Sequence, residues 1–194
     1  MKLARLTIVL AFLLSLVVPL TASAQDVTYE SGIQVQNLGT DTANITVVYY
    51  NQDGSEEATV TDTITVADGS TTYFPIDDVS DGFNGSAVIS SDQPVAAISN
   101  MLLTEEGGGM WAFGGASYGG FNAGANALNL PLLMKENSGF STWFNVQNAG
   151  SSDASVTVTY DTGATETATI PPGAAATFDQ AANGDLPSPY IGSA

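Results

Sequence analysis

The chain has 194 residues, carries twenty acidic but only three basic side chains, and contains no histidine and no cysteine. These absences exclude Ser-His-Asp and Cys-His catalytic arrangements, zinc sites with nitrogen and sulfur ligands, and disulfides. The formal net charge of −17 disfavours nucleic acid as a partner, while the 44% hydrophobic content argues against an acidic disordered segment.

Residues 1–24 have the pattern of a secretory signal peptide. Lys2 and Arg5 form a basic start, Leu6–Leu20 is apolar, and an A-x-A cleavage motif occupies 22–24. An uncleaved N-terminal anchor is the alternative, but the apolar run is short for a membrane span. We therefore expect a secreted or cell-surface protein without a membrane span after cleavage.

After the signal, short segments alternate apolar and polar residues, as half-buried strands do. Turn residues such as Asn51–Gly54 and Asp68-Gly69 separate them, and no segment has a convincing helical period. The spacing predicts an immunoglobulin-like antiparallel β-sandwich over residues 25–104. Its expected strands are Gly32–Asn37, Ala43–Tyr50, Glu57–Val66, Ser70–Phe74, Gly85–Ser90 and Val95–Leu103.

Residues 105–127 combine many glycines with aromatic side chains, which a flexible glycine linker does not need. We expect a long connecting loop whose aromatics pack on the sandwich or between modules. Packing is the favoured interpretation, and a sugar-stacking platform is the alternative. The aromatic candidates are Trp111, Phe113, Tyr118, Phe121 and, further on, Trp143. Asn129–Lys135 is then a bridging strand that either closes the first module or opens the second.

The stretch 33–49 occurs a second time as 144–160. A repeat of this length fixes the architecture, so we expect a second β-sandwich module over residues 128–194. The glutamine and asparagine side chains that both copies share are expected to form hydrogen bonds with the backbone of the turn at the end of the strand. A contact with carbohydrate is the alternative. The signature residues of the repeat are Gln36, Asn37 and Gly39 in the first copy, and Gln147, Asn148 and Gly150 in the second.

The second module is expected to be incomplete. Its last residues, Gly192–Ala194, match Gly85–Ala87, so a counterpart of Val88–Leu103 is missing. A sandwich that lacks two strands exposes apolar faces and unpaired edges. We expect that the sequence is a fragment of a longer protein or, as the alternative, that another chain supplies the strands, for example through self-association.

The segments QNLG, ITVVYYNQDG and GFNGSAVISSDQPVAAISN, followed by LNLPLLMKENSGFSTWFNVQNAG, resemble tandem repeats of uncharacterised secreted proteins from filamentous green non-sulfur-type bacteria. This resemblance covers nearly the whole chain after the signal, and it implies an extracellular, surface-associated array of β-sandwiches without an assigned activity. The order QN-x-G, YY, DG and SD-x-PV is also similar to the sensory-rhodopsin transducer family, a small β-sandwich that oligomerises. The second resemblance covers one module and implies the fold alone.

Calcium is the most reasonable ligand, because hard cations prefer clustered oxygen ligands from loops. Asp77, Asp78 and Asp81 share one turn, although EF-hand spacing is not met and ordinary turn formation is the alternative. No residues convincingly support carboxylate-pair or Ser-Lys catalysis. We therefore expect a non-catalytic structural or adhesion-type repeat protein, with no required cofactor. The alternative is an extracellular module that binds calcium or carbohydrate, and the expected partners are other repeats or a cell-surface polysaccharide.

Overall fold

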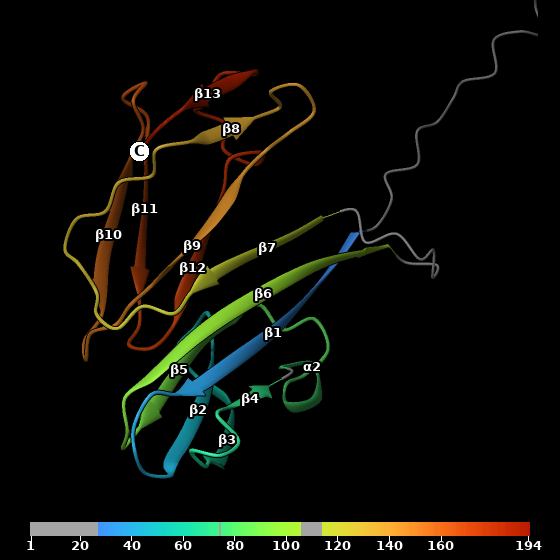
Figure 1. The fold of residues 1–194 in the computed structure, drawn as a ribbon. Helices are drawn as coiled ribbons and strands as arrows, with labels where there is room; N and C mark the ends of the chain where they lie inside the picture. The colour runs from blue at the N-terminus through green and yellow to red at the C-terminus, as the bar shows by residue number, and fades with distance from the viewer. Residues whose placement is uncertain (1–26, 74, 106–113) are drawn as a thin grey trace, which may run out of the picture.

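The computed structural model describes residues 27–73, 75–105 and 114–194. These residues form two groups of antiparallel strands, with β7 running from the first group toward the second (Figure 1). The expected all-β class is confirmed, with a single helical turn, α2 (Pro75–Asp78), as an addition. None of the helical structure described here has the length and apolar character that crossing a membrane requires.

The N-terminal strands form two sheets, in the orders β4-β1-β6-β7 and β3-β2-β5. Side chains of β2 alternate, so that Ala43, Ile45, Val47 and Tyr49 are buried. They pack with Ile33, Val35 and Tyr73 of the other sheet to form the first core. Complete burial of an aliphatic side chain contributes about 1.5–3 kcal/mol, so this core holds the two sheets together. The strands are β1 (Val27–Asn37), β2 (Ala43–Asn51), β3 (Glu56–Ile64), β4 (Ser70–Tyr73), β5 (Gly85–Ser91), β6 (Val95–Glu105) and β7 (Gly114–Gly119).

The C-terminal strands form three two-stranded ladders, β12-β9, β10-β11 and β13-β8. Their strands are β8 (Leu133–Lys135), β9 (Trp143–Gln147), β10 (Ala154–Thr159), β11 (Thr165–Ile170), β12 (Ala175–Asp179) and β13 (Tyr190–Gly192). The second core gathers residues of all three ladders and of the turns beside them, namely Leu133, Val158, Tyr160, Phe178, Leu186 and Tyr190. Because β8 pairs with β13, the expected bridging strand belongs to the C-terminal group.

Strand β7 lies inside the stretch that the sequence predicted to be a loop, so that prediction is wrong for Gly114–Gly119. The strand lies close against β6: a Cβ atom on Gly115 would come 3.3 Å from the carbonyl oxygen of Met101. Just past β7, the Gly120 nitrogen donates a 2.7 Å hydrogen bond to the carbonyl oxygen of Ala97. Glycine carries no hydropathy signal, and the alternation that identifies other strands is therefore missing here.

Candidate functional site

The two groups of strands meet where the turn before β12 packs against β2 and β5. Gly173 of this turn has a φ of +78°. A Cβ atom there would come 2.9 Å from the ring of Tyr50. The carbonyl oxygen of Gly173 accepts hydrogen bonds from Ser86 Oγ at 2.6 Å and from Gln147 Nε2 at 3.0 Å. Only glycine combines this backbone conformation with so close an approach to a ring.

We call the contact of Gly173 with Tyr50 and Ser86 the joint. Further contacts extend it on both sides. Gln147 Nε2 also lies 3.3 Å from the carbonyl oxygen of Ala87, to which it donates, so this amide contacts both groups of strands. Gln52 Nε2 donates to Thr177 Oγ1 at 3.2 Å. The signature residue Gln147 therefore bonds across the joint rather than only within its own turn. The other signature glutamine, Gln36, lines a groove of about 330 Å³ with Gln34 and residues 96–98.

A polar groove of about 460 Å³ lies next to the joint and is open to solvent. Glu57 accepts hydrogen bonds from Ser80 Oγ at 2.5 Å, from the Ser80 nitrogen at 2.9 Å and from Asn51 Nδ2 at 3.0 Å. These bonds, led by the Ser80 hydroxyl, lower the pKa of Glu57. The pKa of Asp53 is lowered mainly by its bond from Ser55. Both carboxylates therefore stay charged at neutral pH and give the groove an anionic wall. Its lining residues are Asn51–Asp53, Glu57 and Ser80–Asn84.

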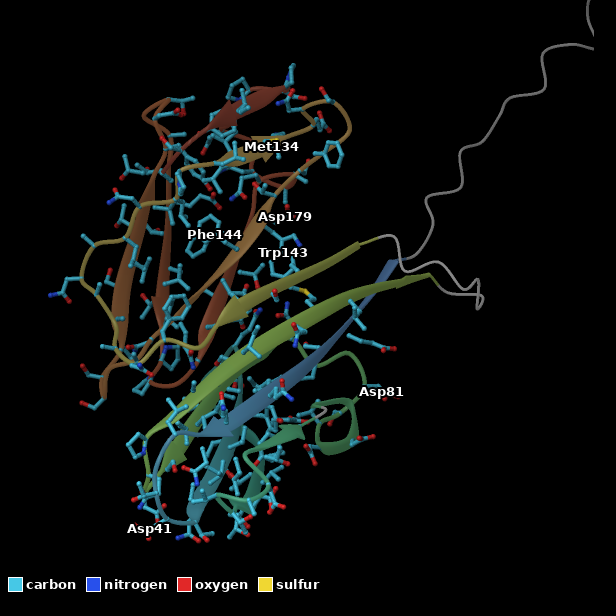
Figure 2. All side chains as sticks on the ribbon, viewed as in Figure 1. Asp41, Asp81, Met134, Trp143, Phe144 and Asp179 are labelled. Carbon is cyan, nitrogen blue, oxygen red and sulfur yellow. The ribbon has the colours of Figure 1, made fainter. Side chains whose placement is uncertain are left out.

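The acidic candidates for a calcium site lie around α2. Asp81 lines the polar groove, and the side chains of Asp77 and Asp78 are exposed. Figure 2 shows Asp81 on the N-terminal group of strands, well away from Trp143 of β9. Across the residues that the structure describes, no three acidic side chains converge in a way that could hold a metal ion.

Two of the five aromatic candidates contact each other on the surface. The rings of Tyr118 and Phe121 stack with centroids 6.4 Å apart and an interplanar angle of 25°. Phe121 is 87% exposed and Tyr118 is 55% exposed. Trp143 lies on β9, next to Phe144, whose ring stacks on Phe178 in the interior. Trp111 and Phe113 lie outside the described residues.

The signature asparagines bond the turns that follow their strands. Asn37 Nδ2 donates to the carbonyl oxygens of Asp41 at 2.8 Å and Ile64 at 3.0 Å, and its Oδ1 accepts from the Gly39 nitrogen at 2.8 Å. Asn148 makes the same three bonds, each of 2.8 Å, with Ser152, Ile170 and Gly150. Each side chain therefore joins its own turn to a neighbouring strand.

Residues 13–181 match a family of unknown function, DUF5719. The chain belongs to the DUF5719 family. No curated protein and no solved structure matches it. Membership in this family therefore assigns no activity to the chain.

A buried polar network in the C-terminal half of this DUF5719 protein was not predicted from the sequence. Gln180 is fully buried, and its Nε2 donates to the Tyr160 hydroxyl at 3.1 Å. That hydroxyl donates to Glu166, which also accepts from Asn183 Nδ2 at 2.6 Å. Lys135 Nζ donates to the Asn183 carbonyl oxygen at 2.6 Å. The hydrogen bonds of this cluster are satisfied within it, so its role is structural, and its polar residues at 180 and 183 lie outside the repeated stretch 144–160.

Proposed function

We propose that this DUF5719 chain is a non-catalytic structural or adhesion-type protein of the secreted or cell-surface class. In this proposal one immunoglobulin-like β-sandwich unit occurs twice, and the joint at Gly173 holds the two units at a fixed angle. The first unit comprises β1–β6 and the second unit comprises β8–β13. The joint is the observation that carries the proposal, because a rigid connection between units is what a spacer requires.

Two structural similarities between the halves of the chain support the proposal that one unit occurs twice. The first is the identical bonding of the two signature asparagines. The second is an aromatic pair in each core: Tyr49 contacts Phe83, and Tyr160 contacts Tyr190. In both pairs the centroids lie 6.2 Å apart and the rings are inclined by 84°. Equivalent edge-to-face contacts at equivalent places favour a common fold for both units.

The chemistry of the joint supports a rigid spacer. Neighbouring domains move relative to one another unless their interface fixes them. Here a backbone carbonyl accepts bonds from both units, and a backbone turn rests on the ring of Tyr50. The donors are the side chains of Ser86 and Gln147, so these hydrogen bonds must offset the conformational entropy that both side chains lose when they are fixed. The acid-rich surface keeps such a spacer soluble outside the cell.

The joint is tested by comparing Gly173→Ala with Gly163→Ala. Both glycines have positive φ, +78° and +88°, but only Gly173 faces a ring, while a Cβ on Gly163 would meet nothing within 4 Å. Each change is expected to cost about 1 kcal/mol of unfolding free energy through backbone strain. Gly173→Ala is expected to loosen the joint as well, which small-angle X-ray scattering would detect as a larger radius of gyration.

The control variant keeps the test specific. Gly163→Ala should retain the scattering profile of the unmodified protein despite its comparable backbone strain. If both variants scatter alike, Gly173 does not hold the two units, and the rigid-spacer proposal fails.

The exposed aromatic pair favours a second candidate function, carbohydrate binding. Sugars stack on aromatic faces, and Phe121 presents most of its ring to solvent beside Tyr118. Phe121→Ala is expected to lower retention on insoluble chitin or cellulose about fivefold, since such contacts contribute about 1 kcal/mol. Leu128→Ala removes another exposed apolar side chain and is the control. Equal retention of both variants would leave the spacer as the remaining function.

A further inference from the structure

The polar network of the C-terminal half contains Lys135, the only lysine or arginine of the chain beyond residue 5. Lys135 ends β8, and its Nζ donates hydrogen bonds to the main-chain carbonyl oxygens of Asn183 at 2.6 Å and of Leu186 at 3.4 Å. Both carbonyls belong to the segment between β12 and β13. Although the chain has twenty acidic residues, both of these bonds go to uncharged oxygens. The amine of Lys135 is therefore held against Asn183.

The side-chain amide of Asn183 has a fixed orientation beside this amine. Asn183 is only 7% exposed. Its Oδ1 accepts a hydrogen bond from the Asp185 nitrogen at 2.8 Å, and its Nδ2 donates to the carboxylate of Glu166 at 2.6 Å. The Tyr160 hydroxyl donates to the same carboxylate oxygen. The amide carbon thus lies between an N–H that stabilises negative charge on Oδ1 and a carboxylate that exchanges protons with Nδ2.

These side chains are the parts that an exchange of amides requires. A deprotonated lysine amine is a nucleophile for carbonyl carbons, and a carboxylate in contact with the leaving nitrogen acts as general acid and base. The protein fold holds the amine and the amide together, which removes most of the entropic barrier to their reaction. Burial of the amide also limits the access of water, which would otherwise compete as the nucleophile.

We propose that Lys135 and Asn183 form an intramolecular isopeptide bond, with Glu166 as the proton carrier. Rotation at the end of the lysine side chain moves Nζ from the main-chain carbonyl of Asn183 to Cγ of the same residue. The Nζ–Cγ bond forms and the Cγ–Nδ2 bond breaks. The lysine ammonium loses two protons, which pass through Glu166 to Nδ2, so that the amide nitrogen leaves as an ammonium ion. No oxidant, reductant or cofactor is consumed.

The bond ties β8 to the segment before β13, across residues that are 48 apart in the sequence. A covalent tie over such a loop stabilises a fold mainly by removing conformations from the unfolded chain, as a disulfide does. Because the chain has no cysteine, it cannot obtain this effect from a disulfide. The reaction occurs once per molecule and without turnover, so it goes beyond the proposed structural function and remains compatible with it. It depends on the C-terminal residues alone and not on the joint at Gly173.

Trypsin tests the proposal on the full chain, because it cleaves after lysine only when the amine is unmodified. Cleavage after Lys2 or Arg5 removes only a few N-terminal residues, whereas cleavage after Lys135 divides the protein. After denaturation in urea, the unsubstituted protein is expected to remain one large fragment. Asn183→Ala keeps Lys135 but lacks the carboxamide, so it is expected to be cut at Lys135. The mass of the intact unsubstituted protein is expected to be lower, by one molecule of ammonia, than its sequence requires.

Glu166→Gln tests the proton carrier. Glutamine keeps an acceptor for Asn183 Nδ2 and for the Tyr160 hydroxyl, but it does not take up a proton. This variant is expected to be cut at Lys135 as completely as Asn183→Ala. Resistance of Glu166→Gln to trypsin would overturn the role of Glu166.

The unsubstituted protein decides the proposal, however either variant folds. If trypsin cuts it at Lys135 as completely as it cuts Asn183→Ala, there is no isopeptide bond. Loss of ammonia from a protein that is still cut at Lys135 would also overturn the proposal, in favour of cyclisation of Asn183 onto the nitrogen of Gly184. None of these outcomes depends on the scattering of Gly173→Ala, so failure of the rigid-spacer proposal remains distinguishable.

Discussion

Asn37→Ala and Asn148→Ala are each expected to lower the free energy of unfolding by about 3 kcal/mol, because each leaves buried backbone groups without hydrogen-bond partners. Both asparagines are nearly buried, at 9% and 6% exposure. Each joins its turn to a strand, through the carbonyl oxygens of Ile64 and Ile170 respectively. Urea denaturation followed by tryptophan fluorescence and circular dichroism measures the loss.

The neighbouring glutamine gives the matched control. Gln36 is exposed and points away from the first core, so Gln36→Ala should change the unfolding free energy by less than about 0.5 kcal/mol. Asn37→Asp provides a second comparison, since it keeps the acceptor for the Gly39 nitrogen but loses the amide donors. Equal effects of Asn37→Ala and Gln36→Ala would show that the signature asparagine does not hold the turn.

The repeat also predicts where each loss should occur. If the units unfold in separate steps, Asn37→Ala should shift the step of the first unit, and Asn148→Ala should shift that of the second. A joint that couples the units would instead shift a single transition in both variants. This comparison measures how strongly the contacts at Gly173 link the two cores.

The strands and the asparagine turns could be predicted because their signals are local. Alternation in Ala43–Asn51 reports which side chains are buried, and the copied Asn-x-Gly spelling points to a shared turn. Local patterns do not report contacts between distant segments. The bond from Gln147 to Ala87 joins residues 60 apart in sequence, and no spacing rule predicts it.

Other features were missed because the residues involved are ambiguous on their own. The β7 sequence GGASYG reads as a loop, and it becomes a strand only because β6 provides a ladder for it. Gln180 and Asn183 resemble ordinary turn residues until their amides are seen to meet Tyr160 and Glu166. In each case contacts with residues distant in the sequence determine the structure, and the local sequence pattern does not predict it.

Tyr160→Phe is expected to lower the free energy of unfolding by about 2 kcal/mol, because it leaves the buried amide of Gln180 without its bond to the hydroxyl. The equivalent change in the first unit should act differently. Among the described residues, the buried Tyr49 hydroxyl has no hydrogen-bond partner. Tyr49→Phe therefore removes an unsatisfied polar atom, and is expected to be neutral or stabilising by up to about 1 kcal/mol.

The stability of the same variants at alkaline pH distinguishes the effect of burying the Tyr49 ring from the effect of its hydroxyl. Burial, assisted by the charge of Asp78, raises the pKa of Tyr49 from 10.0 to about 12. Because the pKa is higher in the folded state, folding favours the neutral phenol. The contribution of this pKa difference to the free energy of unfolding is complete below pH 10 and is lost as the pH rises toward 12. The unmodified protein should therefore lose stability relative to Tyr49→Phe above pH 10. If Tyr49→Phe instead costs as much as Tyr160→Phe at neutral pH, the hydroxyl of Tyr49 has a partner, and the asymmetry between the two cores disappears.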